Sequence, residues 1–162
     1  MERKKFIASF LQINERNIIK LLWYLSVVSR YRTSAARKRI MKSVRSKNTR
    51  PELLVRSMLH RLGYRFRVHV SNLPSKPDIV FRSRSKVILV NGCFWHAHEN
   101  CPFSHTPRSR TKYWNEKLST NRRRDKENLQ KLQELGWASL TVWECELADK
   151  ETLTSKLINF LG

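Results

Sequence analysis

Apolar residues recur at helical spacing in four parts of the chain. The spacing predicts helices over 35–45, 49–63, 111–135 and 153–161. The second of these has the clearest boundaries, because Thr49 and Glu52 form a capping box and Gly63 supplies a stop.

Apolar and polar residues alternate between these helices, which is the pattern of half-buried strands. The predicted strands cover 64–70, 78–81, 86–90 and 139–143. The segment 91–107 is irregular and dense in histidine, cysteine and aromatic residues. Mixed helices and strands of this kind indicate one α/β domain, which we expect to cover 34–162.

Residues 1–33 differ in character from the rest. The stretch 18–29 is largely apolar, but Lys20 interrupts it and it is shorter than the roughly 20 apolar residues of a membrane span. A basic start followed by apolar residues mimics a signal peptide, yet no small-residue cleavage site follows. We therefore expect 1–33 to be a helical extension of unassigned role, and we expect no membrane partner.

The charge of the chain points to a polyanionic partner. Lys and Arg number 33 against 13 Asp and Glu, for a formal charge of +20, and such an imbalance repels itself in a folded protein. Hydrophobic residues make up 40% of the chain, which is too many for a basic tail. Basic residues interleaved with Tyr113 and Trp114 favour nucleic acid as the partner. A solvated basic face is the alternative, and a membrane surface is the weakest one.

Three cysteines and a histidine suggest a metal site. An odd, low cysteine count argues against a disulfide framework and for a reducing compartment. Cys93, Cys101, Cys145 and His98 form the ligand set of a closed tetrahedral zinc site. Zinc would hold a polar loop rigid and tie it to the strand that ends near Cys145. Unligated cysteines are the alternative, and His105 competes with His98 as a ligand.

Asp78, His96 and Glu52 are candidates for chemistry. Asp78 begins an apolar strand, and a carboxylate there suits Mg²⁺, which activates water and stabilises charge on a phosphate. A turn-terminating Asp after Pro77 is the alternative. His96 is not needed for the zinc site, so it is either a general base near neutral pH or an exposed histidine. The capping box alone explains Glu52.

Longer motifs carry a more specific signal. They are MKSVRSKNTRPE at 41–52, KPDIVF at 76–81, NGCFWHAHENC at 91–101 and LQELGWASLTVWEC at 132–145. Together they closely resemble the very short patch repair (Vsr) DNA mismatch endonucleases, over about 34–160. The resemblance implies a restriction-endonuclease-like α/β fold, with a central mixed β-sheet flanked by helices and a structural zinc. It also implies a Mg²⁺-dependent enzyme that starts very short patch repair. Such an enzyme nicks double-stranded DNA 5′ of the thymine in T:G mismatches left by deamination of 5-methylcytosine.

The resemblance assigns roles to site residues. Asp78 would be the metal-binding carboxylate, with the backbone carbonyl of Val90 as its partner ligand. His96 would activate the attacking water, and Glu52 would organise metal-bound waters. Asn91 stands where the best-known member has a second active-site histidine, and Asn cannot exchange a proton near neutral pH. The implied zinc ligands are Cys93, His98, Cys101 and Cys145.

The resemblance also assigns DNA contacts. Phe94, Trp95 and Trp114 would wedge into the duplex beside the mismatch, with Met41 and Val44 entering from the opposite groove. Asn121, Arg122, Arg123 and Arg124 would contact phosphates and base edges. A mispaired step resists unstacking least, so wedging favours mismatches. A helical core stripe is the alternative for Met41 and Val44, and a solvated face is the alternative for the charge run.

Two other functions stay open. One is a Vsr-like nicking endonuclease that belongs to a restriction–modification system and acts in another sequence context. The other is a non-catalytic zinc-containing DNA-binding module, against which Asp78, His96 and Glu52 argue together. The resemblance further implies a monomer in the bacterial cytoplasm, at the nucleoid, with mismatch-repair proteins as candidate partners.

Overall fold

The computed structural model describes Arg39 and residues 47–162. The chain divides into two units, Met1–Lys47 and Asn48–Gly162, and the fold below is that of the second unit. The predicted extension 1–33, most of the predicted helix 35–45, and the DNA-contact candidates Met41 and Val44 lie outside the described residues. The predicted domain boundary at 33/34 therefore stays a prediction.

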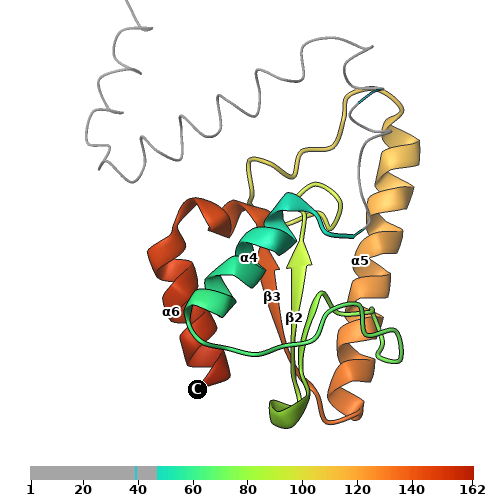
Figure 1. The fold of residues 1–162 in the computed structure, drawn as a ribbon. Coiled ribbons are helices and arrows are strands. Elements are labelled where there is room, and N and C mark those ends of the chain that lie inside the picture. The colour runs from blue at the N-terminus through green and yellow to red at the C-terminus, as the bar shows by residue number, and fades with distance from the viewer. Residues whose placement is uncertain (1–38, 40–46) are drawn as a thin grey trace, which may run out of the picture. The chain divides into compact units, whose positions relative to one another are not determined.

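A mixed three-stranded sheet forms the centre of the second unit. Its strands are β1 (Ile79–Phe81), β2 (Lys86–Asn91) and β3 (Ala138–Trp143), in the order β1-β2-β3. β1 is antiparallel to β2, and β2 is parallel to β3 with Asn91 opposite Trp143. The carboxyl ends of β2 and β3 therefore meet at one edge of the sheet, as Figure 1 shows.

Helices pack on the sheet as the apolar pattern predicts. The helices are α4 (Arg50–Arg61), α5 (Thr111–Glu134) and α6 (Lys150–Leu161). Leu59 of α4 and Leu157 of α6 belong to one core cluster with the sheet residue Ile88. Leu132 of α5 belongs to a second cluster with Val87 of β2. Because neighbouring residues of a strand point to opposite faces, α4 and α6 cover one face and α5 covers the other. The predicted sheet flanked by helices is confirmed.

The predicted strand over 64–70 is wrong. This segment makes one isolated bridge, in which Arg67 and Val80 exchange backbone hydrogen bonds of 2.9 and 2.8 Å. The left-handed backbone of His69, at φ 57°, ends the extended run. Alternation in this segment instead reflects side-chain packing, since the rings of Tyr64 and Phe66 both contact Phe81.

Two further features bear on the site. Residues 92–110, between β2 and α5, have neither helix nor strand, as predicted for 91–107. Among the residues that the structure describes, no helix has the length and apolar character needed to cross a membrane.

Candidate active site and metal-binding cluster

Asp78 lies immediately before β1, beside the end of β2. Its Oδ2 accepts a hydrogen bond of 2.7 Å from the backbone N–H of Val90, which ties the start of one strand to the end of the next. Burial raises the pKa of Asp78 to about 6, although the Val90 N–H favours the charged form. An ionised carboxylate is therefore unfavourable here unless a cation joins it. The role of the Val90 carbonyl stays a prediction.

Glu52 lies in the first turn of α4 and is buried, with 4% of its surface exposed. Its Oε1 accepts from the Thr49 hydroxyl at 2.7 Å, and its Oε2 accepts from Asn48 N at 2.9 Å. The Thr49 hydroxyl in turn accepts from Glu52 N, so Thr49 is confirmed as the N-cap, whereas the return bond of the predicted capping box comes from Asn48 N and not from Thr49 N. The cap does not exhaust the role of Glu52, because its negative charge also raises the pKa of Asp78.

His96 is paired with an acid from α5. Its Nδ1 lies 2.6 Å from Oδ2 of Asp125, and both side chains are about one-quarter exposed. An Nδ1–H that donates to the carboxylate leaves Nε2 free to accept a proton. The field of His96 also reaches Asp78, whose pKa it lowers. Asp78 therefore interacts electrostatically with both Glu52 and His96, and the catalytic roles of the three residues stay predictions.

Asp125 is a candidate site residue, through its contact with His96, that the sequence pattern did not reveal. It is the acid that ends the run Arg122–Arg123–Arg124, where a charge run predicts only a solvated face. An acid directly after three arginines is the signal that could have identified it. Asn91 lies next to Val90, is partly buried and ends β2, so this strand runs one residue beyond the predicted 86–90.

The predicted metal ligands converge. Cys93, His98, Cys101 and Cys145 each offer a ligand atom, and these atoms lie within 4.8 Å of one another. Tetrahedral zinc with thiolates at about 2.3 Å separates its ligand atoms by about 3.8 Å, so the donor set and spacing fit a metal ion. His105 is outside this cluster; it is exposed, and its Nδ1 lies 3.4 Å from the Pro102 carbonyl oxygen.

The thiols of the cluster shift one another's pKa values in opposite directions. A hydrogen bond with Cys93 lowers the pKa of Cys145 to about 6, and the same contact raises the pKa of Cys93. His98 lies 3.5 Å from the Cys145 sulfur and stacks on Trp143, with ring centroids 4.0 Å apart. The cluster can hold a metal that links residues 93–101 to the end of β3.

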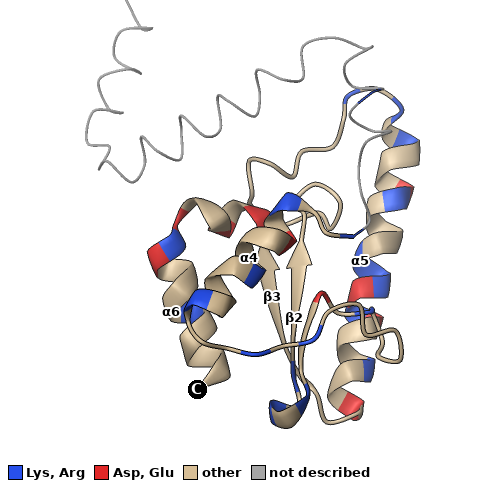
Figure 2. Cartoon of the chain, viewed as in Figure 1, with Lys and Arg blue, Asp and Glu red and all other residues tan. Residues whose placement is uncertain are grey.

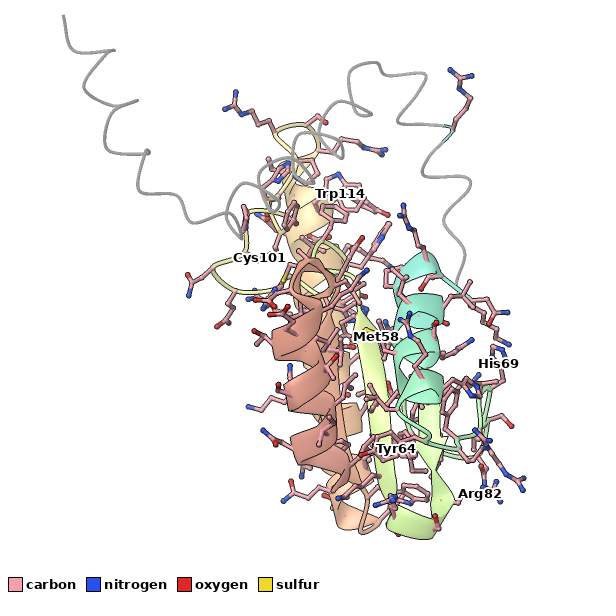
Figure 3. The ribbon with its side chains drawn as sticks, turned by 60° about the vertical axis from the view of Figure 1, so that its left-hand side comes forward. Met58, Tyr64, His69, Arg82, Cys101 and Trp114 are labelled. Atoms are coloured by element: carbon pink, nitrogen blue, oxygen red, sulfur yellow. The ribbon has the colours of Figure 1, made fainter. Side chains whose placement is uncertain are left out.

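The predicted DNA-wedging aromatics form one group. The ring centroids of Phe94 and Trp95 are 5.1 Å apart, and Trp114 lies 5.2 Å from Phe94 and 6.1 Å from Trp95. Tyr113 extends the group at 5.2 Å from Trp114, and half of its surface is exposed. Figure 3 shows Trp114 and Cys101 at the same end of the molecule, opposite Tyr64 and Arg82.

The candidate DNA contacts at 121–124 on α5 include both buried and exposed side chains. Asn121 is buried, and its amide donates to the Trp95 carbonyl at 2.8 Å. This hydrogen bond fixes the backbone of the aromatic group to α5. Arg124 donates weakly to the Asn121 side chain at 3.4 Å. Arg122 and Arg123 are exposed, in keeping with their predicted phosphate contacts. Figure 2 shows positions of Lys and Arg, in blue, along α5.

Comparison with known proteins gives the site its context. The family model described as DNA mismatch endonuclease Vsr matches residues 15–102. Type II nicking enzyme V.XorIIP of Xanthomonas oryzae pv. oryzae is 50% identical over 131 residues, which cover 80% of this chain and 96% of that protein. DNA mismatch endonuclease Vsr of Escherichia coli is 40% identical over 124 residues, 76% of this chain and 79% of that protein. Type II nicking enzyme V.NmeAIP of Neisseria meningitidis is 38% identical over 125 residues, 77% and 89% of the two chains. The chain is therefore a nuclease that belongs to the DNA mismatch endonuclease Vsr family.

Proposed function

We propose that this nuclease is a Mg²⁺-dependent enzyme that nicks double-stranded DNA 5′ of the thymine in a T:G mismatch, and so starts very short patch repair. The observation that supports it is the interaction of two fixed side chains. Asp78 is bound by the Val90 N–H, and His96, which is bound by Asp125, lowers the pKa of Asp78. We include in the proposal a restriction-endonuclease-like fold, in which a carboxylate at the edge of a mixed sheet faces the phosphate.

Asp78 and the Val90 carbonyl would hold the magnesium ion. The fit is chemical: Mg²⁺ prefers oxygen ligands, and a buried carboxylate with a raised pKa favours a cation beside it. When bound, Mg²⁺ stabilises charge on the phosphate and makes a nearby water more acidic. Glu52 orients water molecules around the site, because both of its carboxylate oxygens are fixed by α4 and its cap.

His96 accepts the proton of the attacking water at Nε2. Asp125 holds the ring in the tautomer that this step requires and stabilises the imidazolium that forms. Asn91 can hydrogen-bond to the phosphate but cannot exchange a proton near neutral pH. His96 therefore acts as the single base.

The four-residue cluster would hold zinc, whose role is structural. Three thiolates and one imidazole are typical of closed zinc sites. Phe94, Trp95 and His96 stand in the chain between the ligands Cys93 and His98. A metal ion there would restrict the freedom of the general base and the aromatic group together.

Mismatch selectivity would come from the aromatic group. Phe94, Trp95 and Trp114 would enter the duplex beside the mismatch, where unstacking opposes them least. Met41 and Val44 would enter from the other groove, and Arg122 and Arg123 would contact phosphates. We expect a monomer that acts at the bacterial nucleoid, with mismatch-repair proteins as candidate partners.

A second candidate follows from the relatives. V.XorIIP and V.NmeAIP are named as type II nicking enzymes, which favours an enzyme attached to a restriction–modification system. This candidate keeps the chemistry and the site residues, and it changes the sequence context in which the enzyme acts.

Strand-labelled duplexes test both candidates. We expect the chain with Mg²⁺ to nick T:G duplexes 5′ of the thymine and to leave matched T:A and C:G duplexes intact. The flanking sequence that is cut fastest identifies the context and separates the two candidates. Equal nicking of matched and mismatched duplexes would overturn the proposed function, and His96→Ala is the control for a contaminating nuclease.

A further inference from the structure

Arg56 is a largely buried cation one turn after Glu52 in α4. Only 11% of its side chain is exposed. Its Nη1 donates to the Asn48 side chain at 2.7 Å, and its Nη2 donates to Glu52 Oε2 at 3.0 Å and to the Asp78 carbonyl oxygen at 3.3 Å. One guanidinium therefore joins the segment before α4, the first turn of α4 and the residue before β1.

A simple helix-stabilising pair does not account for this arrangement. Glu52 and Arg56 are spaced i,i+4, a pair that contributes little when it is exposed. This pair is buried, and the same nitrogen also reaches Asp78, which lies 22 residues away in the sequence. Within the described part of the chain, Arg56 Nε is buried and has no hydrogen-bond partner. A buried, incompletely satisfied guanidinium is a poor way to gain stability alone.

The charges around Arg56 suggest what it does instead. Glu52 and Asp78 are two carboxylates close enough for the first to raise the pKa of the second, and Arg56 opposes that effect. Without a cation between them, Glu52 would be pushed away from Asp78. The guanidinium holds Glu52 Oε2, while Thr49 holds Oε1, so the carboxylate is fixed at both oxygens.

We propose that Arg56 is a positioning residue for the nicking reaction, whose guanidinium fixes the Glu52 carboxylate relative to the backbone of Asp78. This inference rests on the proposed function, in which Glu52 and Asp78 organise the groups around the scissile phosphate. A planar guanidinium serves three acceptors in fixed directions, whereas the ammonium of Lys is a point charge on a flexible stem.

Arg56→Met tests the inference, with Arg61→Met as the matched control. Arg61 is an exposed arginine in the last turn of the same helix, so its substitution removes the same charge away from the site. We expect Arg56→Met to lower kcat about 10- to 100-fold, the usual loss when a supporting residue of a metal site is removed. KM, and Kd for a T:G duplex in Ca²⁺, should change less than about twofold, because the Arg56 side chain is only 11% exposed and donates to groups of the protein. Arg61→Met should keep the kcat of the unaltered chain.

A double-mutant cycle with Glu52→Gln tests whether Arg56 acts through Glu52. We expect Arg56→Met to change kcat less than about twofold when Glu52 is already Gln. Full multiplication of the two losses would overturn the inference. Urea unfolding of each variant shows whether it is folded. Arg56→Lys, which keeps the charge but not the fork, replaces the Met variant if that one is unfolded, and it too should be at least about tenfold slower.

Nicking assays of the unaltered chain and the Arg56 variants, run together, distinguish failure of this inference from failure of the proposed function. No nicking of T:G duplexes by the unaltered chain would overturn the proposed function and the inference with it. Normal nicking by the unaltered chain and by both Arg56 variants would overturn the inference alone.

Discussion

Replacing Asp78 by Asn should stabilise the magnesium-free protein while removing activity. Burial raises the pKa of Asp78 from 3.8 to about 6, so the carboxyl group ionises at a higher pH in the folded state than in the unfolded chain. At about 1.4 kcal/mol per pH unit, that difference corresponds to about 3 kcal/mol of lost stability once both states are ionised. Asn carries no charge at any pH, and its side-chain oxygen can still accept from the Val90 N–H.

The sign follows from the two pKa values of Asp78. Below pH 3.8 both states are protonated, and the group has no effect on stability. Between 3.8 and about 6 the unfolded chain releases its proton first, so stability falls as pH rises; above about 6 the loss is complete. Linkage gives an advantage of Asp78→Asn over the unaltered chain of about 1 kcal/mol at pH 4.5 and about 3 kcal/mol at pH 8.

Urea unfolding at both pH values, without magnesium and with bound zinc retained, measures this advantage. If the new side-chain amide of Asn finds no partner for its N–H, the variant loses the same stability at both pH values. The test is therefore the increase of its advantage by about 2 kcal/mol from pH 4.5 to pH 8. Glu116→Gln, at an exposed position on α5, is the control and should stay within about 0.5 kcal/mol. An advantage that does not grow with pH would refute the reasoning. Added Mg²⁺ should stabilise the unaltered chain and not Asp78→Asn.

Four other outcomes can be checked. His96→Ala should abolish nicking while mismatch binding measured in Ca²⁺ changes little; normal cleavage would remove His96 from the mechanism. Asp125→Asn should slow nicking about 10²- to 10⁴-fold through loss of the correct tautomer, and an unchanged rate would assign the His96 pair a structural role. Cys145→Ser should lose its metal and unfold at a lower temperature; unchanged zinc content by mass spectrometry would contradict the site. DNA affinity should fall about 10³- to 10⁵-fold between about 50 and 200 mM salt if roughly six to ten phosphates are bound, and a flat response would exclude such contacts.

Local patterns predicted most of the elements. The cap at Thr49 and Glu52 and the left-handed Gly63, at φ 83°, mark the limits of the first described helix because both depend on residues close in the sequence. The strands predicted over 78–81, 86–90 and 139–143 agree with the observed strands to within one residue at every end. The segment 64–70 fails because alternation reports which side chains pack and not whether a partner strand is present.

The site was harder to predict where partners are distant in the sequence. The metal cluster was predictable because Cys, His and their spacing identify ligands without any knowledge of the fold. Asp125 and Arg56 look like ordinary surface charges until α5 brings one to His96 and α4 brings the other to Asp78. Asn121 precedes three arginines, which predicts a surface residue. In the structure it is buried and donates to the Trp95 carbonyl.

The metal cluster and the active site depend on the same strand, β2. β2 and β3 run parallel with Asn91 opposite Trp143, so both strands end at the same edge of the sheet. Cys93 follows Asn91 by two residues, and Cys145 follows Trp143 by two residues. A slip of one residue in this register would turn every side chain of one strand to the other face, and it would separate Cys93 from Cys145. The other side of β2 pairs with β1, and Val90 near its end holds Asp78 through a 2.7 Å hydrogen bond. A metal ion that fixes the two cysteines therefore also restrains the end of β2 on which the carboxylate depends, and removal of the metal should impair nicking at temperatures where the sheet is still folded.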